Sequence, residues 1–141
     1  MERSLPIGAL SEATGVKVPT IRYYENVGLM PTAPRSDGNR RLYDENAVGR
    51  LRFIRHAREL GYEVNDIRQL LDLSDQPDRP CREVDAIAQR HLVKINGRIK
   101  RLKALKIEVA RMIGECSKGR VSECRIIDAL AHHEHCIHEQ H

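Results

Sequence analysis

The cysteines are the side chains of this sequence best suited to chemistry, and three of the four have an unusual spacing. Cys81 precedes a long stretch with helical periodicity, whereas Cys116 and Cys124 follow it. The N-terminus resembles no signal peptide, so the default compartment is the reducing cytoplasm, where cysteines are ligands or reactive thiols more often than disulfides. Thiolate sulfur is a soft ligand that binds ions such as zinc, cadmium, lead, mercury and monovalent copper. Cys81, Cys116 and Cys124 are therefore candidate ligands of a metal ion, although buried, inert cysteines would give the same residues.

The stretch between these cysteines has the pattern of a coiled coil. Apolar residues recur at alternating steps of four and three, interrupted only where Lys106 stands beside Leu105; they are Ala88, Leu92, Ile95, Ile99, Leu102, Val109 and Ile113. A helix over 81–113 is roughly 50 Å long at 1.5 Å per residue. Cys81 therefore cannot reach Cys116 and Cys124 of its own chain, but it could reach them on an antiparallel partner. If these thiols share a metal ion, the site is shared between the two subunits of a homodimer, at about one ion per subunit.

A second group of ligands follows in the C-terminal tail. Imidazole and thiol side chains lie close together there and could form an accessory zinc or cadmium site; they are His132, His133, His135, Cys136 and His138. A disordered polar tail that binds metal only weakly explains the same residues equally well. Both interpretations stay open at this stage.

The N-terminal residues have a helix-turn-helix pattern. Ile7 to Thr14 predicts a short helix that Gly15 ends, and Pro19 then opens a second helix that runs to about Gly28. A recognition helix needs side chains in its first turns that reach bases or phosphates. The second helix and the turn before it offer Lys17, Thr20, Arg22, Tyr23 and Tyr24 as DNA contacts. The extended piece that follows predicts a wing, with Arg40, Arg41 and Tyr43 as further DNA contacts.

Two more helices are expected after the wing. Asp44 can cap a third helix that Gly61 ends, and a fourth helix lies around 66–73. The third helix and the wing contain a run of arginines, which favours phosphate contacts, although a solvated helix face would look the same; the run comprises Arg40, Arg41, Arg50, Arg52, Arg55 and Arg58. The fold class is thus mainly α, with a winged helix-turn-helix domain and a long antiparallel coiled-coil dimerisation helix.

Length and composition set the limits of this interpretation. The chain has 141 residues, a net charge of +4, 40% hydrophobic residues and no Trp, which supports only a modest core. We expect a winged helix-turn-helix domain over 1–75, a linker over 76–80, a dimerisation helix over 81–113, a metal-binding loop and short helix over 114–131, and a histidine-rich tail over 132–141. No stretch is long enough for a membrane span. No nucleophile–base pair or phosphate-binding loop indicates an enzyme.

Three segments resemble the signature of the MerR family of transcriptional regulators. They are Thr20-Ile21-Arg22-Tyr23-Tyr24-Glu25 followed by Gly28-Leu29, then Arg41-Leu42-Tyr43, and then the run from Leu51 to Gly61. The likeness covers residues 4–131. It implies a dimer on double-stranded promoter DNA, with an effector site near the dimer ends. It also implies that effector binding twists and bends a promoter whose two elements are spaced too far apart, so that RNA polymerase can use it.

The same resemblance bears on the metal. Cys116 and Cys124 match the paired loop cysteines of the metal-sensing branch. Sensors of monovalent ions usually carry serine where this chain has Cys81, so the likeness is to sensors of divalent ions. The loop lacks the histidine that is typical of zinc sensors, and histidine-rich tails occur in cadmium-responsive relatives. The resemblance therefore favours cadmium or lead, with zinc and mercury as alternatives.

A redox function uses the same cysteines in a different way. A thiol-based redox-sensing transcription regulator would respond to oxidants with no metal present, and metal content measured against thiol reactivity separates the two hypotheses. A drug-binding regulator of the same family is disfavoured, because too few residues follow Ile113 for a separate effector core. We expect a metal-responsive activator.

Overall fold

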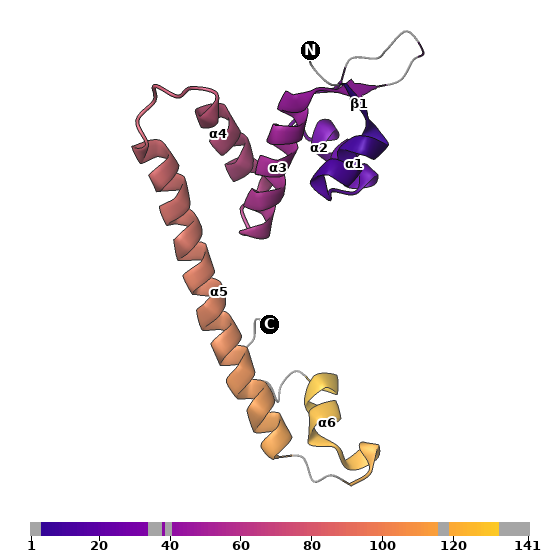
Figure 1. The fold of residues 1–141 in the computed structure, drawn as a ribbon. Helices are drawn as coiled ribbons and strands as arrows, with labels where there is room; N and C mark the ends of the chain where they lie inside the picture. The colour runs from indigo at the N-terminus through magenta and orange to yellow at the C-terminus, as the bar shows by residue number, and fades with distance from the viewer. Residues whose placement is uncertain (1–3, 34–37, 39–40, 116–118, 133–141) are drawn as a thin grey trace. The chain divides into compact units, whose positions relative to one another are not determined.

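Helices dominate the parts of the chain that the computed structural model describes, residues 4–33, 38, 41–115 and 119–132 (Figure 1). The α-helices are α1 (Ile7–Thr14), α2 (Val18–Asn26), α3 (Glu45–Glu59), α4 (Val64–Ser74), α5 (Arg82–Gly114) and α6 (Arg125–Ala131). Two short strands, β1 (Leu5–Pro6) and β2 (Leu42–Tyr43), and one turn of 3-10 helix, η1 (Val121–Glu123), accompany them. The predicted mainly α fold class is confirmed.

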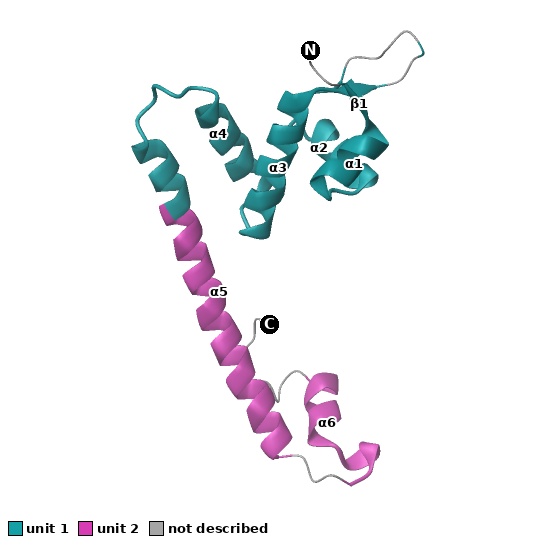
Figure 2. Ribbon diagram, viewed as in Figure 1, with its two compact units in different colours: residues 1–88 teal, residues 89–141 magenta. Residues whose placement is uncertain are grey.

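The chain forms two compact units, residues 1–88 and residues 89–141 (Figure 2). The first unit contains the two strands, helices α1 to α4 and the start of α5. The second contains the remainder of α5, then η1 and α6. The finer division into five segments stays a prediction.

The turn between α1 and α2 is built as the sequence predicts. Gly15 adopts the left-handed conformation, with φ of 74°, and its N–H donates to the carbonyl of Ser11 at 2.8 Å. The Thr14 hydroxyl donates to the Leu10 carbonyl at 2.8 Å and accepts from the Val16 N–H at 3.3 Å. Pro19 lies in the first turn of α2, where its missing N–H costs nothing. The helix-turn-helix arrangement is therefore fixed by local chemistry.

The wing strand has a partner that the sequence did not indicate. Strand β2 pairs antiparallel with β1, with Leu5 opposite Tyr43 and Pro6 opposite Leu42. A two-residue strand that runs directly into a helix has no periodicity from which to predict it. Directly after β2, the Asp44 side chain accepts the Ala47 N–H at 2.9 Å, so the predicted cap of α3 is confirmed.

One core holds the elements of the first unit together. It is formed by side chains from helices α1 to α4, the turn after α2 and the wing. The largest fully buried side chains are Leu10, Ile21, Leu29, Met30, Tyr43, Leu51, Ile54 and Ile67. Burying one such side chain contributes about 1.5–3 kcal/mol. Because α3 packs against α1, α4 and the wing, it is the central helix of this unit.

Helix α5 is continuous over 33 residues, which corresponds to roughly 50 Å. It begins at Arg82, one residue later than predicted, and the Asp85 N–H donates to the Cys81 carbonyl at 2.9 Å. Cys81 therefore stands immediately before the first helical residue. Asp78 and Pro80 both precede the helix, because its first hydrogen bond is accepted at Cys81.

Candidate nucleic-acid interface and metal ligands

The outer face of α2 carries the side chains that are free to meet a ligand. Lys17, directly before the helix, and Arg22 are exposed, and Tyr23 is 50% exposed. Thr20 is partly buried. Tyr24 differs from its neighbour: it is only 7% exposed and belongs to the core, and its ring centroid lies 5.8 Å from that of Tyr23. An exposed cation, guanidinium fork and phenol on α2 and directly before it suit a nucleic-acid backbone and its bases.

A shallow basic hollow of about 380 Å³ lies beside the start of α2. It is open to solvent and is lined by Gly15, Val16, Lys17, Thr20, Tyr24, Arg55, Arg58 and Glu59. Three cationic side chains line the hollow, and one of them, Arg55, is paired with Glu59 at 3.0 Å. The remaining net positive charge favours an anion such as a phosphate group. The sequence placed Arg55 and Arg58 in a basic run but did not predict that they meet Lys17 here.

Glu25 joins the wing to α2. Its Oε1 accepts from the Tyr43 hydroxyl at 3.1 Å and lies 3.6 Å from the Arg41 guanidinium. The Glu25 side chain is 5% exposed, and its Oε2 has no hydrogen-bond partner in the described part of the chain. Burial, followed by the hydrogen bond and charge of Glu25, raises the pKa of Tyr43 above 10.0. Tyr43 is only 2% exposed, so its place is inside the junction between wing and helix.

The arginines of α3 serve the fold as well as the surface. Arg52 donates to the Ala13 carbonyl at 3.3 Å, and Arg55 donates to the Thr14 carbonyl. Both carbonyls belong to the last turn of α1, where the helix dipole favours a cation. Arg58 donates to the Tyr62 carbonyl at 3.0 Å. A sequence shows only that a run of arginines is basic, so it could not distinguish these backbone bonds from phosphate contacts; Arg40 lies outside the described residues.

The two cysteines that the structure describes each precede a helix. Cys81, before α5, is exposed and free, and Cys124, before α6, is partly buried. The Asp128 N–H donates to the Cys124 carbonyl at 3.0 Å, which fixes the start of α6. Both thiols suit a soft metal ion in their chemistry. Cys116, the third predicted ligand, lies outside the described residues.

Only one of the predicted accessory ligands can be placed. His132 ends α6, is exposed, and has its Nε2 3.7 Å from Asp128 Oδ1. His133, His135, Cys136 and His138 lie outside the described residues. Within the described ranges of this single chain, no three His, Cys, Asp or Glu side chains gather at one point.

The second unit contains a polar hollow of about 400 Å³ between the last turn of α5 and α6. It is lined by Arg111, Met112, Glu115, Arg125, Asp128 and Ala129. Arg111 forms an ion pair with Glu115 at 3.1 Å. Among the described residues, no helix is long and apolar enough to span a bilayer.

Two protein-family models match the chain. The model described as MerR HTH family regulatory protein matches residues 5–74, and the one described as MerR, DNA binding, matches residues 48–112. The chain is also 37% identical over 127 residues to the HTH-type transcriptional regulator ZntR of Escherichia coli, covering 88% of this chain and 90% of that protein. The chain belongs to the MerR family. This MerR protein is accordingly a helix-turn-helix transcriptional regulator and not an enzyme.

Two further similar proteins are described together with heavy metals. It is 34% identical over 125 residues to the heavy metal-dependent transcription regulator 2 of Rhizobium meliloti, covering 89% of this chain and 85% of that protein. Among solved structures it is similar to PbrR691 of Ralstonia metallidurans in complex with lead(II), with 39% identity, a TM-score of 0.77, and coverage of 89% of this chain and 98% of that one. These likenesses extend over α5 and are not confined to the DNA-binding elements.

Proposed function

We propose that this MerR protein is a metal-responsive activator. As a homodimer on promoter DNA, it turns on metal-resistance or efflux genes when it binds a divalent soft metal ion. The observation that carries the proposal is the position of two cysteines at opposite ends of one continuous helix, Cys81 before Arg82 and Cys124 beyond Gly114. Relatives named for heavy metal dependence and for mercuric resistance, together with the similar structure in complex with lead(II), support the metal class.

The exposed apolar stripe of α5 supports the dimer. Side chains of the predicted seam are largely open to solvent in the single chain: Leu92 is 51% exposed, Ile99 44%, Leu102 65%, Val109 54% and Ile113 59%. Such a row of aliphatic side chains at coiled-coil spacing is stable in water when a second helix covers it. An antiparallel partner brings its own Cys116 and Cys124 to Cys81. Each dimer then has two shared sites, which corresponds to about one ion per subunit.

Several side chains are proposed to contact DNA directly. Lys17, Arg22 and Tyr23 on the exposed face of α2 are joined by Thr20, and Arg40 and Arg41 act from the wing. Tyr24 and Tyr43, which are buried, act by holding α2 and the wing in place. Metal binding shifts the dimer towards the form that deforms the promoter for RNA polymerase, because a ligand favours the state that it binds more tightly.

Cadmium or lead is the effector that we favour, with zinc or mercury as alternatives. Three thiolates without a histidine in the 116–124 loop form a soft ligand set, which suits the heavier ions. The histidine-rich tail is proposed as an accessory site through His132, His133, His135, Cys136 and His138. The comparisons give no support to the redox alternative.

A titration tests the function. Promoter output is measured with the purified full-length protein while cadmium, lead, zinc and mercury are added separately under reducing conditions. We expect output to rise with at least one ion, at about one ion per subunit, and Cys81→Ser to abolish the rise while leaving operator affinity intact. A metal-free protein that activates only on oxidation, with formation of a disulfide, would support redox sensing instead. A full metal response in Cys81→Ser would refute the three-thiolate site.

A further inference from the structure

We propose that Asp75 and Arg50 transmit the metal response, by linking the segment that carries Cys81 to the turn behind the recognition helix. The inference rests on the proposed metal-responsive function and names the residues that couple metal binding to α2. The residues concerned belong to the first unit. Arg50 pairs with Asp75, and Gln76 bonds to Arg79, which pairs with Glu83; the peptide bond between Asp75 and Gln76 joins the two groups. We call these five residues the linker bridge.

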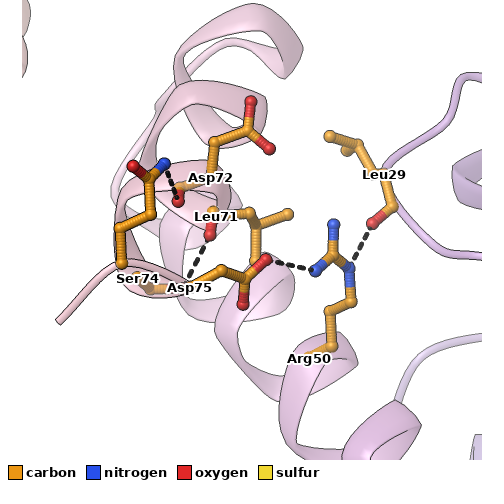
Figure 3. A network of polar contacts seen from close by, with 7 residues as sticks. Leu29, Arg50, Leu71, Asp72, Ser74 and Asp75 are labelled. Carbon is orange, nitrogen blue, oxygen red and sulfur yellow. Dashed lines mark hydrogen bonds and ion pairs between the residues drawn. The ribbon is translucent and has the colours of Figure 1, made fainter.

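Arg50 stands at one end of the linker bridge (Figure 3). From α3, its Nε donates to the Leu29 carbonyl at 2.7 Å, in the turn that follows α2. Its Nη1 lies 3.7 Å from Asp75 Oδ2, at the end of α4. One guanidinium thus contacts both the turn behind the recognition helix and the first residue after α4. Leu29 is fully buried, so that turn cannot move independently of the core around it.

The other half of the linker bridge spans the segment between α4 and α5. The Gln76 N–H donates to the Leu73 carbonyl at 3.0 Å, and its side chain donates to the Asp72 carbonyl at 3.1 Å. Arg79 donates to Gln76 Oε1 at 3.2 Å and forms an ion pair with Glu83, in the first turn of α5. Gln76 and Glu83 are thereby joined across the linker that contains Cys81. A metal ion that repositions Cys81 therefore displaces a segment that polar contacts hold at both ends.

The exposure of these groups means that they add little to the stability of the core. The Asp75 side chain is 67% exposed, and those of Arg79 and Glu83 are 46% and 41% exposed. Ion pairs this open to water add little to folding. They can still bias an equilibrium between two arrangements of the linker, because coupling between sites needs only a small difference in free energy between the states. The pair between Arg50 and Asp75 borders an open groove of about 670 Å³, so it can break and re-form without repacking the core.

Two neighbouring residues provide matched controls. Asp72 is an exposed carboxylate in the last turns of α4, and no ion pair of its side chain is found within the described ranges. Arg68 donates from α4 to the Val27 carbonyl, so it also holds the end of α2, but it has no contact with the linker bridge. Asp72→Asn therefore controls for charge, and Arg68→Lys controls for loosening of the recognition helix.

The test compares these variants in the full-length protein. Transcription from promoter DNA selected by the protein is measured with saturating operator occupancy, with and without cadmium or lead; operator affinity is measured separately in both states. We expect Asp75→Asn and Arg79→Gln each to lower the ratio of output with metal to output without it by roughly two- to fivefold, the range that a partly exposed ion pair supports. The output ratio of the double variant should be no lower than that of the more affected single variant, because both changes interrupt the same linker bridge. Asp72→Asn should keep the parental ratio.

The outcomes separate the two proposals. If the parent responds to metal and Asp75→Asn matches Asp72→Asn, the linker bridge does not transmit the response, and the proposed function stands. If Asp75→Asn weakens operator binding equally with and without metal at an unchanged output ratio, as expected of Arg68→Lys, its role is structural and the inference is overturned. A parent that responds to none of the four ions overturns the proposed function and this inference together.

Discussion

Replacing Leu102 by alanine tests whether the exposed stripe of α5 is the dimer contact. Leu102 is 65% exposed in the single chain and lies in the middle of the predicted seam. Alanine keeps the helix, because it is the best helix former. The substitution removes three carbon groups, worth about 0.8 kcal/mol each when buried, of which roughly two-thirds is gained only on dimerisation. The loss is about 1.6 kcal/mol per chain and about 3 kcal/mol per dimer, or roughly 200-fold in the dissociation constant.

Sedimentation equilibrium over a range of protein concentrations measures this constant directly. Lys103→Ala is the matched control, since Lys103 is the exposed neighbour of Leu102 and lies off the seam. Circular dichroism should show the same helix content in all three proteins. A change of less than threefold for Leu102→Ala, at unchanged helix content, would refute the reasoning that the stripe is covered by a second copy of the chain.

Three further predictions concern the metal ligands, the turn before α2 and the wing. When Cys81→Ser and Cys124→Ser chains are mixed, the heterodimer should bind one ion by native mass spectrometry while each homodimer binds none tightly; an equal loss in all three would mean that the ligands come from one chain. Gly15→Ala should lower the free energy of unfolding by about 1–2 kcal/mol in thermal melts, because φ of 74° disfavours a Cβ and that Cβ would collide with Arg55, whereas Gly8→Ala, with open space around it, should not. The pKa of Tyr43 is raised in the folded protein, so the unfolded chain loses this proton at a lower pH than the folded chain. The free energy of unfolding that this group contributes below pH 10.0 should therefore fall as the pH rises through the folded pKa. Tyr43→Phe should lack this fall, and an identical alkaline stability profile for both proteins would contradict the assignment.

Local signals account for the parts of the fold that were predicted well. Gly15 at the end of α1, Pro19 at the start of α2 and Asp44 before α3 each act on backbone within four residues, so sequence proximity is enough to interpret them. The same holds for the long helix, whose apolar period continues over many turns. Strand β1 was missed because its pairing with β2 joins segments almost forty residues apart.

The same distinction between local signals and long-range packing applies to the candidate site. Residue types and spacing predict a soft-metal site at Cys81, Cys116 and Cys124, which stays a prediction, and DNA-contacting side chains on α2, of which Arg22 and Tyr23 are exposed. They were not enough to separate Tyr23, half exposed, from Tyr24, which is in the core. Adjacent helix positions differ by about 100° in direction, and only the packing of the other helices decides which of the two faces inwards.

By itself the sequence determined the helix-turn-helix and the continuous α5. It therefore also determined the distance between the two ends of α5, since helical rise is a property of the backbone alone. Only the tertiary structure decided which groups the arginines contact. Arg50, Arg52 and Arg55 all appear in one basic run, yet they reach the carbonyls of Leu29, Ala13 and Thr14. A guanidinium bonds to whichever acceptor folding brings within its reach, and those acceptors lie 21 to 41 residues away along the chain.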